Sequence, residues 1–483
     1  MLQFAEVITS EQVERIHEAS LEILEDVGLS VRNHKARQVF ERHGCRIESG
    51  TDLVKFIPAV VEEFRLYFPP SFTFHGRDPR FDRTIPGEGP LIVTGSSAPN
   101  LIDPISGLER RSTSTDIATI AHLINELPGY DVFSISTLAD DAPEGHFTLA
   151  RLYPALKNCL KPVRSTATDR EDAQMILELA YLIAGSEDAY RERPFVTHHF
   201  CPVVSPLTMD FASTEMVMFF AEKGLPVYGS VVPNAGLSSP MTIAGTLAQG
   251  NAEFLASSVL LQMVRAGTPL IYSTLPTVAD LRTGAYASGG IECGLLHMAF
   301  AQMARFYKVP YGGYIGLSNS KINDAQSGYE TGMSTLAGVL AGMDMLNMGG
   351  LLDALKAFDF AKAVIDDEIA LMLKRIVCGI QFSEADLALD VISEVGPGGM
   401  FMVHEHTVSH MRSIAVTPKI SDRETRQVWE AKNSLDAQAR AMRRVREILG
   451  KDSSAIFPPE VEQRIRARFE NLVAGDAILP VGL

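Results

Sequence analysis

Residues 318–330 (SNSKINDAQSGYE) concentrate side chains that can bind or move charge. The segment lies between two apolar, glycine-containing stretches, VPYGGYIGL and MSTLAGVLAGM. A polar run of this density between core-forming stretches is more typical of a site than of a solubilising loop. The alternative is that these side chains cap a helix and bridge loops, but capping does not need all of them. We expect the catalytic groups to be Asp324, Gln326 and Glu330.

Lys321 in the same segment allows a different chemistry. A lysine whose pKa is lowered by burial can form a Schiff base with a carbonyl substrate. Lys321 lies several residues beyond the apolar stretch, however, where solvent or an ion pair with Asp324 is easier to reach. A Schiff-base carbon–carbon lyase is therefore the alternative enzyme.

The segment THHFCP is a second cluster of reactive side chains. In a strand, side chains alternate between two faces, so His199 and Cys201 share a face and His198 takes the other. A zinc site needs three or four convergent ligands, which Cys293 or His297 would have to complete. No H-x-E or C-x-x-C spacing supports such a site, so we expect no bound metal.

Short apolar or β-branched runs alternate with long amphipathic runs from residue 90 onwards. The starts of the short runs are about 30 to 43 residues apart, the length of one βα unit. There are eight of them, at residues 90–97, 132–136, 162–168, 195–201, 226–232, 269–275, 310–316 and 344–350. The pattern predicts an α/β protein with a (β/α)8 TIM barrel. A doubly wound open sheet is the main competitor, and the count of eight favours closure.

The barrel has extensions on both sides in this interpretation. Residues 1–85 form an N-terminal segment of helices and strands, with one helix over 9–28 that begins at a capping box of Thr9 and Gln12. Residues 86–380 form the barrel. Residues 381–483 form a C-terminal helical extension with two charged helices, over 424–449 and 458–475.

Active-site groups of such barrels lie at the C-terminal ends of the strands and in the loops beyond them. The residues at these ends include Ser96, Ser97, Ser136, Thr166, His198, Ser230 and Thr274. Tyrosine faces at the mouth could hold a quaternary ammonium by cation–π attraction, although tyrosines there can also serve only packing. We expect the substrate-binding residues to include Tyr228, Tyr272, Tyr314, Tyr329, His199 and Asn347.

Composition narrows the function classes. The 483 residues are 46 % hydrophobic and 21 % charged, which is typical of an ordered globular protein. A formal net charge of −16 argues against a nucleic-acid partner. Five scattered cysteines without a C-x-x-C pair indicate reduced thiols. The N-terminus does not resemble a signal peptide and no apolar run is long enough for a membrane span, so we expect a cytoplasmic location.

Three segments together resemble the trimethylamine methyltransferase family. They are LEILEDVGLSV near the N-terminus, SNSKINDAQSGYE, and EVGPGGMFMVHEHT, in this order along nearly the whole chain. The resemblance implies a (β/α)8 barrel that moves a methyl group from a methylated amine to cob(I)alamin on a separate corrinoid protein. The chain has no D-x-H-x-x-G motif for binding a corrinoid of its own, so we expect no tightly bound cofactor.

One departure from the family bears on the substrate. Archaeal trimethylamine enzymes of the family carry pyrrolysine in or near the DAQSGYE segment, where this chain has Ser327 and Gly328. Non-pyrrolysine members act on quaternary amines, and glycine betaine is the best-known case. The resemblance therefore implies a quaternary amine, with a carboxylate such as Glu330 or Asp324 near its cation. Arg282 is the candidate for the betaine carboxylate.

The chain is expected to form a homo-oligomer. A non-catalytic quaternary-amine binding protein is the alternative from a different class, because an aromatic site can bind such a cation without any methyl transfer.

Overall fold

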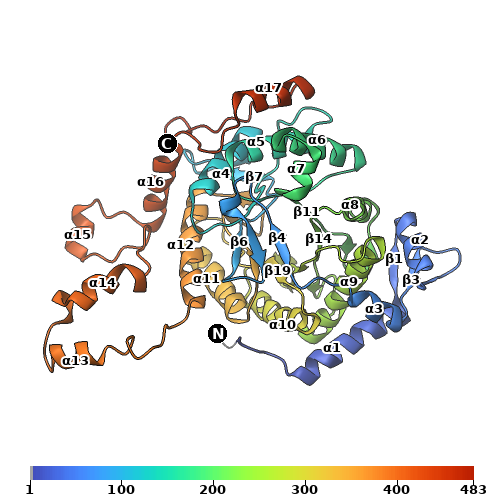
Figure 1. Cartoon of the computed structure of the whole chain (residues 1–483), viewed down its shortest axis with the longest axis horizontal. Helices are drawn as coiled ribbons and strands as arrows, with labels where there is room; N and C mark the ends of the chain where they lie inside the picture. The colour runs from blue at the N-terminus through green and yellow to red at the C-terminus, as the bar shows by residue number, and fades with distance from the viewer. Residues whose placement is uncertain (1–3) are drawn as a thin grey trace.

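Eight parallel strands close into a ring in the computed structural model, which describes residues 4–483 (Figure 1). The strands are β6 (Leu91–Val93), β9 (Phe133–Ser134), β10 (Val163–Ser165), β11 (Val196–Phe200), β14 (Val227–Val231), β16 (Tyr272–Thr274), β19 (Tyr311–Tyr314) and β20 (Met345–Asn347). Neighbours in the chain are neighbours in the sheet, and β20 returns to β6. A parallel bridge between Val93 and Val132, just before β9, closes the ring. Each strand lies within one of the eight predicted runs, so the predicted barrel is confirmed.

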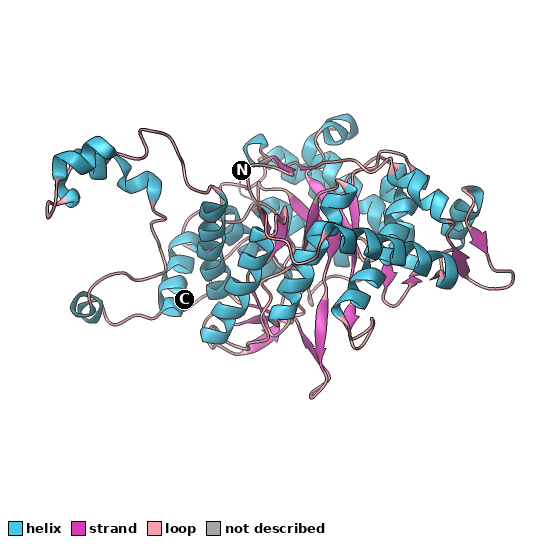
Figure 2. Ribbon diagram, turned by 90° about the horizontal axis from the view of Figure 1, so that it is seen from below, coloured by secondary structure: helices cyan, strands magenta, loops and turns pink. Residues whose placement is uncertain are grey.

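A long helix follows each strand and covers the outside of the ring (Figures 1 and 2). These helices are α4 (Ser114–Glu126), α5 (Phe147–Asn158), α6 (Arg170–Ala184), α8 (Phe211–Glu222), α9 (Ile243–Val264), α10 (Ile291–Tyr307), α11 (Ala325–Leu340) and α12 (Phe360–Val377). A short α7 (Glu187–Glu192) follows α6. Most of them begin at a residue whose side chain accepts a hydrogen bond from a backbone N–H of the first turn. On α4, for example, Thr113 and Asp116 form a capping box.

A hairpin of β4 (Phe72–Phe74) and β5 (Arg83–Ile85) closes the N-terminal end of the barrel. Its apolar side chains pack inside the ring, in a cluster that consists of Phe72, Phe74, Ile85, Leu91, Val93, Val132, Tyr228, Ile271 and Met345. The lower half of the barrel is therefore a packed core, which leaves the C-terminal end for a site.

Between residue 4 and this hairpin the chain contains three α-helices, one π-helix and three short strands. The predicted capping box at Thr9 and Gln12 starts α1 (Ser10–Glu22), which continues as the π-helix η1 (Ile23–Val27). The others are α2 (His34–Arg42), α3 (Pro58–Arg65), β1 (Leu29–Val31), β2 (Arg46–Ile47) and β3 (Leu53–Lys55). The helices α1 and α3 pack on α9 of the barrel.

The loops above the barrel form small sheets that extend its wall. One sheet joins β7 (Asn100–Ile102) and β8 (Glu109–Arg111) to β21 (Leu351–Leu352) and β22 (Ala357–Phe358). Another contains β15 (Asn234–Ala235), β17 (Thr277–Asp280) and β18 (Ala285–Ala287). The strands β12 (Val203–Val204) and β13 (Thr208–Met209) join the N-terminal sheet through β1.

The last hundred residues leave the barrel after α12 and return to it. Figure 1 shows α13 (Leu389–Val395), α14 (Glu405–Ile414) and α15 (Arg426–Ala431) apart from the barrel, with α16 (Ala437–Leu449) back beside α12 and α17 (Pro459–Arg468) near α6. A single turn of 3-10 helix, η3 (Phe401–Val403), precedes α14.

The prediction of one helix over 424–449 is wrong. Asn433 and Ser434 adopt left-handed backbone conformations, with φ of 69° and 51°, and these end the first helical piece. Asp436 then caps α16 by accepting a hydrogen bond from the Ala439 amide.

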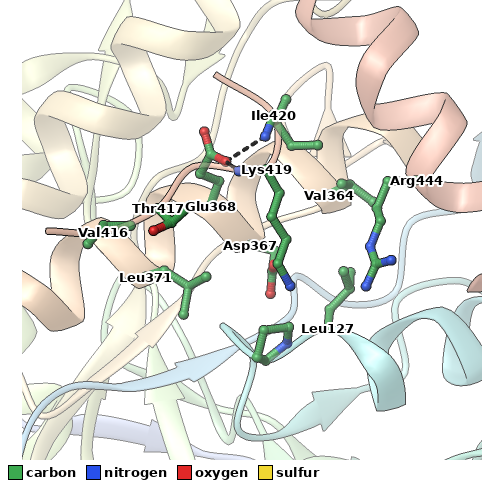
Figure 3. A pocket seen from close by; sticks show the side chains of 11 residues that line it. Leu127, Val364, Asp367, Glu368, Leu371, Val416, Thr417, Lys419, Ile420 and Arg444 are labelled. Atoms are coloured by element: carbon green, nitrogen blue, oxygen red, sulfur yellow. Dashed lines mark hydrogen bonds between the residues drawn. The ribbon is translucent and has the colours of Figure 1, made fainter. Parts of the chain in front are cut away.

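Glu368 on α12 holds the returning chain (Figure 3). Its carboxylate accepts hydrogen bonds from the backbone N–H groups of Lys419 (2.6 Å), Ile420 (2.7 Å) and Ser421 (2.8 Å). The hollow beside it measures about 10 Å³, room for no more than a water molecule, so it is not a substrate site. The division of the chain at residues 85 and 380 stays a prediction. No helix within residues 4–483 has the length and apolar character needed to cross a membrane.

Candidate active site

A cavity of about 500 Å³ lies at the C-terminal ends of the barrel strands. Its size is in the usual range for a small-molecule site. It is lined by Ser96, Ser97, Thr166, Ala167, Thr168, His199, Phe200, Cys201, Ala212, Ser213, Ser230, Val232, Leu275, Tyr314 and Leu355. Ser97, Thr168 and Ala212 are also exposed on the surface, so the cavity opens to solvent.

Arg164 on β10 crosses the inside of the barrel beneath this cavity. Its guanidinium donates to Tyr228 Oη (3.0 Å), Tyr314 Oη (2.7 Å) and Ser134 Oγ (2.9 Å). Burial works against its charge, but the Tyr228 and Tyr314 oxygens raise its pKa above the usual value. Our choice of candidates from the sequence missed this residue. The available signal was a charged side chain in the middle of an apolar strand, PVRSTAT.

His199 faces the cavity as a neutral imidazole. Its Nε2 lies 2.7 Å from Ser230 Oγ, which in turn lies 2.6 Å from Ser273 Oγ. Burial, together with the nearby Arg164 charge, holds the pKa of His199 well below 6.5. His198 takes the opposite face, as predicted, and its ring stacks on Phe220 with 3.6 Å between centroids.

Cys201, the residue after β11, also lines the cavity. The other suggested metal ligands lie elsewhere. Cys293 and His297 are on α10, and His297 is hydrogen-bonded to Tyr311 Oη (2.7 Å) and the Tyr314 carbonyl oxygen (2.8 Å). Across residues 4–483 no three His, Cys, Asp or Glu side chains converge as a metal site. That the chain binds no metal stays a prediction.

The four tyrosines do not come together as one cage. Tyr314 lines the cavity and Tyr228 lies in the core beneath it. Tyr272 faces outward, where its ring stacks on Phe254 (3.6 Å between centroids) and its hydroxyl donates to Asn251 Oδ1 (2.8 Å). Tyr329 is exposed on α11.

The 318–330 segment follows β19 and starts α11, and its polar side chains bind one another. Asp324 caps α11 through the Ser327 amide (3.1 Å). Glu330 accepts hydrogen bonds from Ser318 Oγ (2.7 Å), the Asn319 amide (2.8 Å) and Gln326 Nε2 (2.9 Å). Within the described part of the chain, the side chains that line the cavity do not include Asp324, Gln326 or Glu330. Their catalytic role stays a prediction.

Lys321 is exposed to solvent over 71 % of its side chain, and its Nζ lies 3.4 Å from Asp353 rather than near Asp324. The 318–330 segment is nevertheless hydrogen-bonded to a loop of the cavity wall. The carbonyl oxygens of Ser320 and Ser318 accept hydrogen bonds from the Asp353 and Ala354 amides, next to Leu355 in the cavity wall.

Two other predicted substrate contacts lie outside the cavity lining. Arg282 is in the turn between β17 and β18, where its side chain is 88 % exposed and paired with Asp280 (2.7 Å). Asn347 on β20 is fully buried. Neither polar atom of its amide has a hydrogen-bond partner among the described residues.

The chain matches the model of the trimethylamine methyltransferase (MTTB) family over residues 1–473. It is 34 % identical to a glycine betaine methyltransferase of Desulfitobacterium hafniense strain Y51, over 95 % of this chain and 96 % of that protein. It is 30 % identical to the trimethylamine methyltransferase MttB of D. hafniense strain DCB-2, over 96 % of this chain and 93 % of that protein. It is 31 % identical to MttB of Methanosarcina barkeri, over 92 % of this chain and 90 % of that protein. The chain belongs to the trimethylamine methyltransferase family. It is therefore a methyltransferase, and the family resemblance predicted from the three segments is confirmed.

Membership of the trimethylamine methyltransferase family directs attention to the cavity at the barrel mouth. A methyl donor bound there would meet His199 and Tyr314, two side chains with flat ring faces. Such faces attract a quaternary ammonium without transferring a proton to it.

Proposed function

We propose that this methyltransferase moves a methyl group from a quaternary amine, glycine betaine in the first instance, to cob(I)alamin on a separate corrinoid protein. The observation that carries the proposal is the character of the cavity, which offers ring faces and a neutral histidine rather than a protonated acid. The similarity to a glycine betaine methyltransferase supports the same substrate.

The chemistry of a quaternary ammonium suits such a cavity. The nitrogen already carries a full positive charge, so a strong nucleophile can attack one methyl carbon in line, and the new bond to that carbon forms as the C–N bond breaks. The C–N electron pair stays on nitrogen, which becomes uncharged, and the leaving group is a tertiary amine, dimethylglycine when glycine betaine reacts. No proton is transferred, so the protein needs no general acid. Its work is to bind the cation and to direct one methyl group towards the cavity opening.

The methyl acceptor is a second substrate that a partner protein carries. The open cavity supports approach of this acceptor from the C-terminal face of the barrel, where Ser97, Thr168 and Ala212 form part of the rim. We propose that this chain binds no corrinoid of its own. We also propose that it forms a homo-oligomer, which the many exposed apolar residues of the C-terminal extension favour.

The direct test follows the cobalt spectrum when enzyme, amine and chemically reduced corrinoid protein are mixed. We expect methylated corrinoid with glycine betaine and none with trimethylamine. Methylation with trimethylamine alone would contradict our interpretation of Ser327 and Gly328. Betaine binding without methyl transfer to any reduced corrinoid would favour the non-catalytic binding protein.

A further inference from the structure

Two buried arginines meet at the inner end of the cavity. Arg164 on β10 is 2 % exposed and Arg151 on α5 is 4 % exposed. They line a polar hollow of about 30 Å³ together with Ser96, Ser97, Ser134, Ile135, Ser165, Thr166 and His199. Ser96, Ser97, Thr166 and His199 also line the main cavity, so the hollow is continuous with it.

All hydrogen-bond partners of both guanidinium groups are neutral. Arg164 donates to the hydroxyls of Ser134, Tyr228, Tyr314 and Ser96. Arg151 donates from Nε to the Thr137 carbonyl oxygen (3.2 Å) and from Nη2 to Ser97 Oγ (3.2 Å). Among the residues that the structure describes, these contacts include no carboxylate oxygen for either group. The Nη1 group of Arg151 has no hydrogen-bond partner among the same residues.

Another buried cation of the protein, in contrast, has a carboxylate partner. Lys362 is as deeply buried as the arginines, and its Nζ lies 2.5 Å from Asp366. Burial lowers the pKa of Arg151 to about 10, against the influence of Asp172, so the group is still charged at neutral pH. A buried charge without a carboxylate in direct contact is unfavourable, and a bound anion would offset that cost. Two such charges at one hollow are therefore suited to an anionic ligand.

We propose that Arg151 and Arg164 bind the carboxylate of the methyl donor, which is therefore a betaine rather than an uncharged or purely cationic methylamine. This inference rests on the proposed function. The planar guanidinium fork matches the geometry of a carboxylate, and serine and threonine hydroxyls around it supply further donors.

The arrangement also orients the substrate. Glycine betaine joins its two charges through one methylene group, so an ammonium beside the rings of His199 and Tyr314 is within reach of a carboxylate held at Arg164, whose guanidinium carbon lies 5.2 Å from the Tyr314 ring centroid. The carboxylate then points into the barrel and the methyl groups point to the cavity opening, where the acceptor arrives. One zwitterion thus satisfies both the buried charge and the direction of methyl transfer.

Binding calorimetry on the full chain without corrinoid protein tests the proposal. Three ligands separate the charges: glycine betaine, choline, which lacks the carboxylate, and 3,3-dimethylbutanoate, which keeps the carboxylate but has carbon in place of nitrogen. We expect wild-type enzyme to bind glycine betaine at least ten-fold more tightly than choline. We expect Arg151→Gln to lose at least ten-fold affinity for glycine betaine and for 3,3-dimethylbutanoate, with less than three-fold change for choline.

Arg80→Gln is the matched control, because its guanidinium is exposed and already paired with Asp78. It should bind all three ligands as the wild type does.

Equal wild-type affinities for choline and glycine betaine would overturn the proposal, and this comparison needs no variant to fold. Unchanged betaine affinity in a folded Arg151→Gln protein would overturn it too, as would an equal loss for choline.

The outcome is separable from that of the proposed function. Carboxylate-dependent binding without methyl transfer to reduced corrinoid protein would keep the anion site and reject the proposed function. Methyl transfer from choline as fast as from glycine betaine would keep the proposed function and reject the anion site.

Discussion

His199 lies beside the expected position of the ammonium group. Burial disfavours the protonated imidazole, and the charge of Arg164 in the same barrel interior disfavours it further, so the ring is neutral. A neutral ring presents an uncharged face to a cationic ligand. A protonated ring would repel it.

This predicts that substrate binding is independent of pH near neutrality. Because the pKa of His199 is well below 6.5, the ring stays neutral from pH 8 to pH 6. We expect the Kd of glycine betaine to change by less than two-fold across this interval in calorimetry. A loss of affinity that follows a titration near pH 6.5 would contradict the prediction.

His198 provides a separate test through stability. Burial lowers its pKa to about 3, and neither ring nitrogen has a hydrogen-bond partner within the described chain. The unfolded chain takes up a proton on this residue near pH 6.5, whereas the folded chain does not. The contribution to stability is therefore full above pH 6.5 and falls as the pH is lowered, by about 1.4 kcal/mol for each pH unit.

We expect His198→Phe to reduce the stability loss between pH 7 and pH 5 by about 2 kcal/mol, that figure being 1.5 pH units of this slope. Phenylalanine keeps the stacking on Phe220 and removes the titration. Denaturant midpoints at the two pH values measure the difference. Equal pH sensitivity of variant and wild type would show that His198 is not buried in its neutral form.

In the helix α11 and the loop before it, side chains that the sequence suggested as catalytic groups form contacts with the loop and the helix themselves. Asp324 is a cap, and Glu330 ties the loop to its own helix through Ser318 and Asn319. A carboxylate can accept hydrogen bonds from backbone N–H groups and so stabilise a loop, or it can bind a cation. The presence of Asp and Glu in the sequence did not show which of these two roles they have.

The anchor of the returning chain on α12 gives a prediction for a whole element. Glu368→Gln keeps one acceptor oxygen and loses the other, so at least one of the amides at Lys419, Ile420 and Ser421 loses its partner. Leaving such a group unpaired costs about 1–3 kcal/mol. We expect hydrogen exchange at these amides to become about 10- to 100-fold faster.

Glu424→Gln is the control, since Glu424 is exposed and pairs with Lys432 (2.6 Å). Acid should act like the substitution. Although burial opposes it, hydrogen bonds from Ser421, Ile420 and Lys419 hold the pKa of Glu368 below its usual value of 4.5. The anchor is thus intact at neutral pH and is lost as the pH falls through that lowered value. Unchanged exchange in Glu368→Gln would show that the anchor contributes little.

The whole molecule consists of a barrel with its site at one end and an apolar arm, which we define as residues 380–414. Figures 1 and 2 show the arm helices α13 and α14 away from the barrel. Its most exposed large apolar residue, Ile380, is 91 % accessible. More than half of each of the following side chains is also exposed: Phe382, Leu389, Ile392, Met400, Met402, Val403, Val408, Met411 and Ile414. Monomeric proteins rarely present so much apolar surface in one segment.

We expect a second copy of the chain to cover the arm. Light scattering after size exclusion should give the mass of a dimer or a higher oligomer. The double substitution Phe382→Asp with Met402→Asp should shift the mass towards the monomer, because it places charge in the contact. Leu66→Asp, at an exposed leucine outside the arm, should leave the mass unchanged. A monomeric wild type, or an unchanged mass of the double variant, would contradict the prediction.

The eight strands could be located from the sequence because each is a short apolar run between turn signals, and such runs are local properties. Their number indicated the barrel, and the barrel indicated which end carries the site. The direction of each side chain was a different matter. Both faces of a parallel barrel strand are buried, so hydrophobicity does not show which face points inward. Tyr228 and Tyr272 both belong to such strands, yet one faces the interior and the other packs on α9. The meeting of Arg151 with Arg164, from a helix and a strand, likewise depends on closure of the ring, which brings together residues that no sequence spacing relates.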